Sequence, residues 1–185
     1  MRNLTRTNQC LLVAVLTGVA TVAAPATAQV INEHIKLLAS DGAAGDRFGF
    51  SIAMDNGVIA VGAYGDGDNG RYSGSAYLFN ASTGVQAHKL LPSDGATWDN
   101  FGRCIAIDDG VVAVGAYRDG DNGDNSGSAY LFNAYTGVQI DKLLPRDGAT
   151  GDRFGWGIAI DNGIVVVGAP KNDDNGNNSG SAYLF

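Results

Sequence analysis

A unit of 53 residues is repeated almost three times in succession, and this repeat limits the possible folds more than any other feature. The copies span Lys36–His88, Lys89–Asp141 and Lys142–Phe185, and the first two agree at 38 of 53 positions without a gap. A period near fifty residues is typical of arrays of identical supersecondary units, most often propeller blades. The structure is therefore predicted for one unit, and the same structure is then expected for each copy.

Each unit predicts a four-stranded antiparallel meander. In the first copy the apolar run 50–54 is followed by Asp55-Asn56-Gly57 and by a second run at 58–63. Asn-Gly between two apolar runs is a strong hairpin signal, because both residues tolerate positive φ. Further strands are expected at 75–80 and 85–91, and the alternation in the last is typical of a half-exposed outer strand. We expect an all-β, propeller-type array of four-stranded antiparallel blades.

The strand count predicts about three blades, and so a partial propeller. A segment at 30–38 resembles a fourth strand, and the three units add four, four and three strands, the last copy stopping in mid-strand at Phe185. Closed propellers have about four to eight blades. Two alternatives follow: the chain is a fragment of a larger propeller, or several chains complete a ring. In both, the open ends of the array are expected to self-associate through uncovered apolar surface.

The first 28 residues are expected to be a signal peptide. Arg2 and Arg6 precede an apolar stretch at 10–24, and Ala26-Thr27-Ala28 fits a small-residue cleavage site. Cleavage after Ala28 would release a domain of residues 29–185. This predicts a secreted, periplasmic or cell-surface protein that does not remain inserted in a membrane.

The charge of the expected mature chain restricts its partners. Residues 29–185 hold ten Lys and Arg against nineteen Asp and Glu, a net charge of −9. Nucleic acid and anionic membranes require neutralising cations, so neither is expected as a partner. Divalent cations and basic proteins suit this charge better. Cys104 is the single cysteine in this range, which excludes an internal disulfide.

The unit resembles the FG-GAP repeat, the blade of integrin alpha-chain propellers and of many exported bacterial proteins. The matching residues are Phe48-Gly49, Phe101-Gly102, Phe154-Gly155 and Gly168-Ala169-Pro170. The resemblance implies a non-catalytic module for adhesion or for binding a protein or other cell-surface ligand. Integrin-type blades carry an Asp-rich calcium loop after Phe-Gly, whereas a short Asp-Asn-Gly turn stands here. That turn cannot supply the six to eight oxygens that Ca²⁺ prefers, so the metal residues of the family do not carry over.

Acidic residues lie instead in the Gly-rich loop after the second strand. We expect these residues to be candidate ligands of Ca²⁺: Asp66, Asp68, Asp119, Asp121, Asp173 and Asp174. The alternative is that Asp and Asn in such loops hydrogen-bond to their own backbone. Asn172, which stands where the earlier copies have Asp66 and Asp119, favours that alternative.

Three hypotheses for the function remain. The first is an exported, non-catalytic module that binds proteins through its Asp-rich loop face. The second is a structural repeat protein stabilised by calcium, and the third is a fragment of a propeller enzyme. The third is weakest, since no Ser-His-Asp, Cys-His or zinc-ligand spacing is present.

Overall fold

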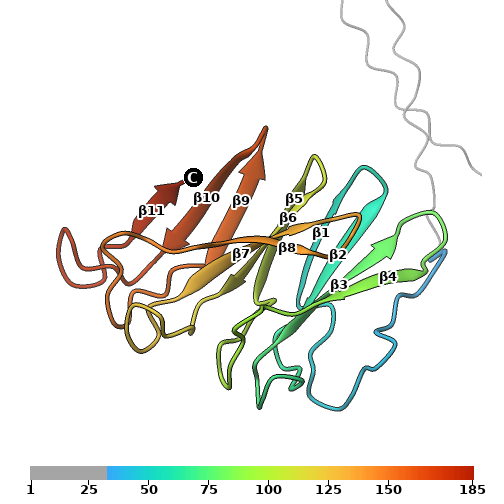
Figure 1. Cartoon of the computed structure of the whole chain (residues 1–185), viewed down its shortest axis with the longest axis horizontal. Coiled ribbons are helices and arrows are strands. Elements are labelled where there is room, and N and C mark those ends of the chain that lie inside the picture. Colours follow the sequence, from blue (N-terminus) through green and yellow to red (C-terminus); the bar gives the residue numbers. More distant parts are fainter. Residues whose placement is uncertain (1–32) are drawn as a thin grey trace, which may run out of the picture. The chain divides into compact units, whose positions relative to one another are not determined.

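The computed structural model describes residues 33–185, which form three antiparallel sheets (Figure 1). We refer to each sheet as a blade. The first comprises β1 (Ser51–Asp55), β2 (Val58–Ala63), β3 (Ser75–Asn80) and β4 (Gln86–Leu90). The second comprises β5 (Cys104–Asp108), β6 (Val111–Ala116), β7 (Ser128–Asn133) and β8 (Gln139–Leu143). The third comprises β9 (Gly157–Asp161), β10 (Ile164–Ala169) and β11 (Ser181–Leu184). The prediction of an all-β array of meander blades is confirmed.

The predicted signal peptide, residues 1–28, lies outside the described residues. The compact unit that contains the blades spans Ile35–Phe185. Within residues 33–185 the structure has no helix of the length and hydropathy that a membrane span requires.

The hairpin turns form where the sequence predicts them. Asn56 and Gly57 connect β1 to β2 with φ values of 44° and 79°. Two successive positive φ values are typical of the type I′ turn, whose twist matches that of the flanking strands. This turn pairs Asp55 with Val58 and sets the register of the whole hairpin, through Ile52 opposite Val61.

The strand expected at 30–38 is not formed over its described part, because residues 33–38 lie in no strand. Leu37 and Ala39 instead pack beside Phe48 on the cluster that contains Tyr77 and Phe79. Apolar contact rather than backbone pairing therefore fixes this segment. The first blade begins at β1, and its sheet order is β1-β2-β3-β4.

The core lies between the blades. The cluster between the first and second blades joins Ala60 and Leu78 to Phe101, Val112 and other residues of the second blade. The corresponding cluster at the next junction joins Ala113 to Phe154 and Val167. The second and third Phe-Gly motifs lie in these junctions, where Phe101 and Phe154 form parallel bridges with Gly74 and Gly127 of the preceding blade. The motif therefore fastens one blade to the one before it.

Phe101→Ala is expected to lower the free energy of unfolding by about 3 to 5 kcal/mol, because a fully buried phenyl ring would leave a cavity. The ring contacts Tyr130 and Phe132 edge-on, at centroid distances of 5.6 and 5.7 Å. Urea denaturation measures the loss. Phe48→Ala is the matched control: Phe48 occupies the same place in the first blade but is only half-buried, and the loss should be clearly smaller. Equal losses would contradict the assignment of the core to the junctions.

Candidate functional site

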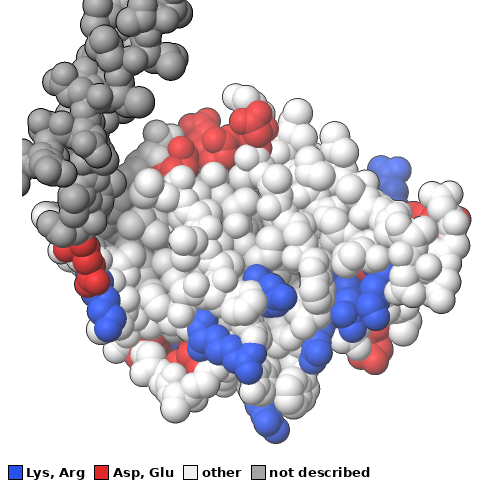
Figure 2. Space-filling view, turned by 180° about the vertical axis from the view of Figure 1, so that it is seen from behind, with Lys and Arg blue, Asp and Glu red and all other residues white. Residues whose placement is uncertain are grey.

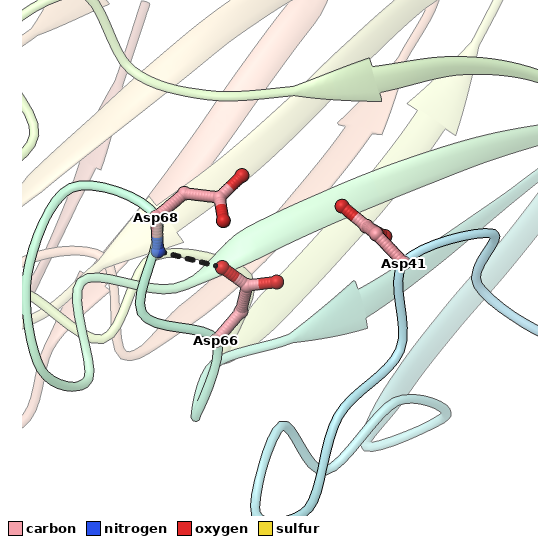
Figure 3. Close-up of side chains that lie close together, drawn as sticks. All are labelled: Asp41, Asp66 and Asp68. Atoms are coloured by element: carbon pink, nitrogen blue, oxygen red, sulfur yellow. Dashed lines mark hydrogen bonds between the residues drawn. The ribbon is translucent and has the colours of Figure 1, made fainter.

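The first blade holds a lysine ammonium among three carboxylates. The Lys89 Nζ lies 2.6 Å from Asp41 Oδ2, 3.0 Å from Asp66 Oδ2 and 2.6 Å from Asp68 Oδ2. Figure 3 shows the three carboxylates converging from two loops. Asp66 is buried, whereas Asp41 and Asp68 are exposed. We call this group, with Tyr77, the first lysine cluster.

The second blade repeats the arrangement almost atom for atom. The Lys142 Nζ lies 2.7 Å from Asp94 Oδ2, 3.1 Å from Asp119 Oδ2 and 2.6 Å from Asp121 Oδ2. Together with Tyr130, these residues form the second lysine cluster. Because the two blades build the same geometry independently, the cluster is a property of the repeated unit.

The local fold explains how the cluster assembles. Asp66 follows β2, and its Oδ1 accepts a hydrogen bond from the backbone N–H of Asp68 at 3.0 Å, as in an Asx turn (Figure 3). Tyr77 comes from β3, and its hydroxyl lies 3.0 Å from both Asp41 Oδ1 and Asp66 Oδ2. Lys89 comes from β4, whose pairing with β3 places Lys89 opposite Tyr77. The turn chemistry and the ion cluster therefore coexist in one loop.

The cluster shifts the pKa of its members in opposite directions. Burial favours the neutral form of Lys89, but hydrogen bonds to Asp41, Asp68 and Asp66 outweigh burial and raise the pKa of Lys89. The hydrogen bond from Lys89 lowers the pKa of Asp41. The pKa of Asp66 is also lowered, because hydrogen bonds from the Asp68 backbone and from Lys89 outweigh the effect of burial.

These directions define a pH window. A carboxylate with a lowered pKa stabilises the fold above its ordinary value of 3.8 and loses that effect as pH falls through its folded pKa. A lysine with a raised pKa stabilises the fold below 10.5 and loses that effect as pH rises further. The clusters are therefore expected to stabilise the fold fully between about pH 4 and pH 10.

The structure brings together four of the six predicted metal ligands. Asp66 and Asp68 join Asp41, and Asp119 and Asp121 join Asp94, with one oxygen of each residue within 4.8 Å of the others in its group. The position between them, which a cation would take, is held by the lysine ammonium in both blades. Sequence reasoning missed the two lysines and the two tyrosines. A signal was present, since each unit begins with Lys-Leu-Leu and each third strand carries Ser-Ala-Tyr.

The third blade does not bring Asp173 and Asp174 into such a group among the described residues. Asp173 Oδ1 accepts a hydrogen bond from the backbone N–H of Asn178 at 2.6 Å, which is turn chemistry. Asn172 replaces the central carboxylate, and its Oδ1 accepts a hydrogen bond from the Ser181 hydroxyl at 2.7 Å. The neutral amide removes the charge that organises the other two clusters.

Asp99 is a buried carboxylate beside the second lysine cluster. It is 6% exposed, and its Oδ2 accepts a hydrogen bond from the backbone N–H of Ala96 at 2.6 Å. Burial, assisted by repulsion from Asp119, raises the pKa of Asp99 to about 6. Its ionised form therefore opposes folding at neutral pH.

Arginine and aromatic side chains form a second feature, which sequence reasoning also missed. The Arg103 guanidinium lies over Phe50 of the first blade and Trp156 of the third, 4.3 and 5.1 Å from the ring centroids. Phe50 contacts Tyr64 edge-on at 4.6 Å, and Arg47 lies 4.9 Å from the Tyr64 ring. One contact thus leads to the next across the three blades.

The series continues at both ends. Arg47 also lies 6.0 Å from the Tyr72 ring, Tyr72 stacks on Trp98 at 4.9 Å, and Arg71 lies over Trp98 at 4.9 Å. At the other end Arg153 lies 5.5 Å from the Trp156 ring. We call the following residues the arginine–aromatic surface: Arg47, Phe50, Tyr64, Arg71, Tyr72, Trp98, Arg103, Arg153 and Trp156.

The charges of this surface are not neutralised by carboxylates. Within residues 33–185, every ion pair involves Lys89 or Lys142, and no arginine takes part in one. Figure 2 shows most of the basic side chains of one face over its lower half, whereas acidic side chains lie along its top and in smaller groups at its edges and lower part. A chain with negative net charge therefore carries a locally basic, aromatic surface.

The remaining candidate residues have structural partners. Cys104 is half-buried at the start of β5, and burial raises the pKa of its thiol. His88 Nε2 lies 3.0 Å from the Tyr135 carbonyl oxygen of the second blade. Gly168 and Ala169 end β10, and the backbone N–H of Asn172 donates to the carbonyl oxygen of Ala169 at 3.2 Å.

Comparison with known proteins gave one family. The family model described as FG-GAP repeat matches residues 31–79, 85–132 and 138–185. No curated protein matches the chain.

Lys142→Met is expected to lower the free energy of unfolding by about 3 kcal/mol at pH 7, because the buried Asp119 carboxylate would lose its counter-charge. Chemical denaturation measures the loss, and Lys171→Met is the control, since Lys171 is exposed and lies outside both clusters. A rise in the melting midpoint of the unsubstituted chain on adding Ca²⁺ would contradict this account, because the carboxylates would then serve a metal.

Asp99→Asn is expected to stabilise the fold at pH 8 by at most about 3 kcal/mol, the free-energy equivalent of the pKa shift from 3.8 to about 6. A carboxyl group with a raised folded pKa stabilises the fold below pH 3.8 and loses that effect as pH rises through about 6. The advantage of the amide should therefore shrink as pH falls from 8 to 4. Melting curves across this range test it, with the partly exposed Asp46→Asn as control. A pH-independent difference would refute the assignment.

Proposed function

Since the chain belongs to the FG-GAP repeat family, we propose that it is an exported, non-catalytic module that binds a partner protein. The binding surface is the arginine–aromatic surface, and the segment that it recognises is acidic. Export rests on the N-terminal pattern of Arg2, Arg6 and Ala26-Thr27-Ala28.

The observation that carries this proposal is the continuous contact series that ends at Arg71 and Arg153. Arginine, tryptophan and tyrosine contribute most of the energy at protein interfaces, because they combine large contact area with polar groups. A guanidinium held over a ring is oriented before the partner arrives, which reduces the entropy lost on binding. Trp98 and Trp156 remain 43% and 37% exposed despite these contacts. Their rings are therefore accessible to a partner.

The charge balance sets the chemistry of the partner. Six Asp residues of the same loops form ion pairs with Lys89 or Lys142 within residues 33–185: Asp41, Asp66, Asp68, Asp94, Asp119 and Asp121. The arginines have no such counter-charge among the described residues. A planar guanidinium pairs well with a carboxylate through two parallel hydrogen bonds. Asp- and Glu-rich segments therefore fit this surface better than basic ones.

A calcium-stabilised structural role is the alternative. It is favoured by the convergence of three carboxylates in each of two blades. To bind Ca²⁺ there, the chain would have to displace an ammonium that makes three charged contacts of 2.6 to 3.1 Å. Binding through the arginine–aromatic surface requires no such displacement, so we prefer it.

The proposal is tested with a fluorescent peptide of alternating Glu and Gly and a neutral peptide of alternating Gln and Gly. The full chain is expected to bind the acidic peptide preferentially, with affinity that falls as salt rises. Arg71→Glu combined with Arg103→Glu is expected to weaken binding by about tenfold or more, since 1.4 kcal/mol suffices for that factor. Fluorescence anisotropy measures both.

Arg146→Glu is the matched control, because Arg146 is exposed and lies outside the arginine–aromatic surface. Arg146→Glu is compared with Arg71→Glu alone, because the two single variants change the net charge equally, and Arg146→Glu should leave the affinity nearly unchanged. Equal losses of affinity in these two variants would mean that net charge alone explains the effect. Equal affinity for the acidic and neutral peptides would refute the proposal.

A further inference from the structure

The two outer sheet faces of the array expose apolar side chains that are buried at the internal junctions. On the first blade, Ile52 is 72% and Met54 is 69% exposed, whereas Ile105, which corresponds to Ile52 in the second blade, is 8% exposed. On the third blade, Leu184 is 71% exposed, whereas its counterpart Leu78 is fully buried. Exposed apolar surface of this kind marks an interaction site.

The internal junctions identify what covers such faces. Each blade has a leading face, which packs on the blade before it, and a trailing face, which receives the blade after it. In the first blade the leading face comprises Phe48, Ile52, Met54, Ile59 and Val61. In the third blade the trailing face comprises Ala159, Ile164, Val166, Ala182 and Leu184. These two faces are the two halves of one junction.

The backbone contacts of the junction are also prepared at both ends. A Cβ atom at Gly62 would lie 2.0 Å from the Gly102 carbonyl oxygen, and one at Gly115 would lie 2.1 Å from the Gly155 carbonyl oxygen. The next pair in this series is Gly168 of the third blade and Gly49 of the first. A Cβ at Gly168 would meet nothing closer than 3.8 Å, and one at Gly49 nothing within 4 Å. Both glycines leave space for a backbone that the described residues do not supply.

A ladder of hydrogen bonds completes each internal junction. The N–H groups of Trp98, Asn100 and Phe101 donate to the carbonyls of Arg71, Tyr72 and Ser73, at 2.9, 3.0 and 2.9 Å. The N–H groups of Gly151, Arg153 and Phe154 donate to the carbonyls of Asp124, Asn125 and Ser126, at 2.9, 3.1 and 2.8 Å. The ladder is thus a repeated feature of the unit.

The third ladder in this series lacks its partner strand at each end. Its donors are the N–H groups of Gly45, Arg47 and Phe48, and its acceptors are the carbonyls of Asn177, Asn178 and Ser179. Within residues 33–185 none of these six groups makes a backbone hydrogen bond. The apolar faces, the glycine pair and the ladder are therefore complementary in the same register.

We propose that the leading face of one copy docks on the trailing face of a second copy, head to tail, through this junction. Two copies present two such junctions, which close a ring of six blades. Closed propellers have about four to eight blades, so the pair falls within this range, whereas three copies would give nine. A head-to-tail contact that closes yields a finite ring rather than a fibre.

The test is the mass of the full chain in solution, measured by sedimentation velocity over a range of concentrations. The expected result is twice the mass of one chain, and at high dilution the mass should fall to that of one chain. Met54→Asp and Leu184→Asp each place a charge on one face, and each is expected to abolish the pair. Both side chains are largely exposed in the single copy, so the variants should fold, which circular dichroism verifies.

A mixture of the two variants distinguishes this geometry from any other. Met54→Asp keeps its trailing face and Leu184→Asp keeps its leading face, so the mixture retains one intact junction and should pair again, more weakly. Val138→Asp is the control. Val138 is exposed but belongs to the second blade, so it lies on neither outer face and pairing should be unchanged. Four results would each overturn the proposal. The chain could have the mass of one copy at every concentration, or it could grow beyond two copies. Met54→Asp could still pair with itself, or the mixture of the two variants could fail to pair.

Discussion

The close approach of backbone to backbone between successive blades is the constraint on which the rest of the structure depends. At Gly62 and Gly102 the two sheets come so near that no side chain fits between them. This approach lets Phe101 form a bridge with the preceding blade and fill the core below it. It also places the loops of adjacent blades side by side, where Arg103 meets rings from both of its neighbours.

The two lysine clusters show how the fold handles charge in a glycine-rich loop. Three carboxylates within reach of one another would repel unless a cation joined them. The chain supplies that cation from the fourth strand of the same blade. In the second blade the Tyr130 hydroxyl lies 2.9 Å from Asp94 Oδ1 and from Asp119 Oδ2, and the second of these oxygens also accepts from Lys142. Six carboxylates of the acidic loops are paired with lysines in this way, whereas no arginine of residues 33–185 forms an ion pair. A negatively charged chain can in this way present a basic face.

The repeat and its turns made much of the fold predictable. Asn56-Gly57 fixed a hairpin, and the Phe48-Gly49 spacing placed the start of each blade. The clusters were less accessible, since Lys89 lies 23 residues from Asp66 and meets it only through the register of β3 and β4. The arginine–aromatic surface was least accessible, because its central position is not repeated: Phe50, Arg103 and Trp156 occupy one position in the three units. Only the junctions bring these unlike residues together.

The bonds at the hairpin tips have a consequence for how the array melts. The Asp55 carboxylate accepts a hydrogen bond from the backbone N–H of Asp109 at 3.0 Å, and the Asp108 carboxylate accepts one from Asn162 at 2.8 Å. The second blade therefore shares a hydrogen bond between hairpin turns, an apolar cluster and a ladder of backbone hydrogen bonds with each of its two neighbours. Each outer blade shares these features with only one neighbour among the described residues. In a linear array of this kind, cooperativity passes between nearest neighbours. In a single, unpaired copy, amide protons of β6 should accordingly exchange with solvent last, and the array should fray inward from both ends.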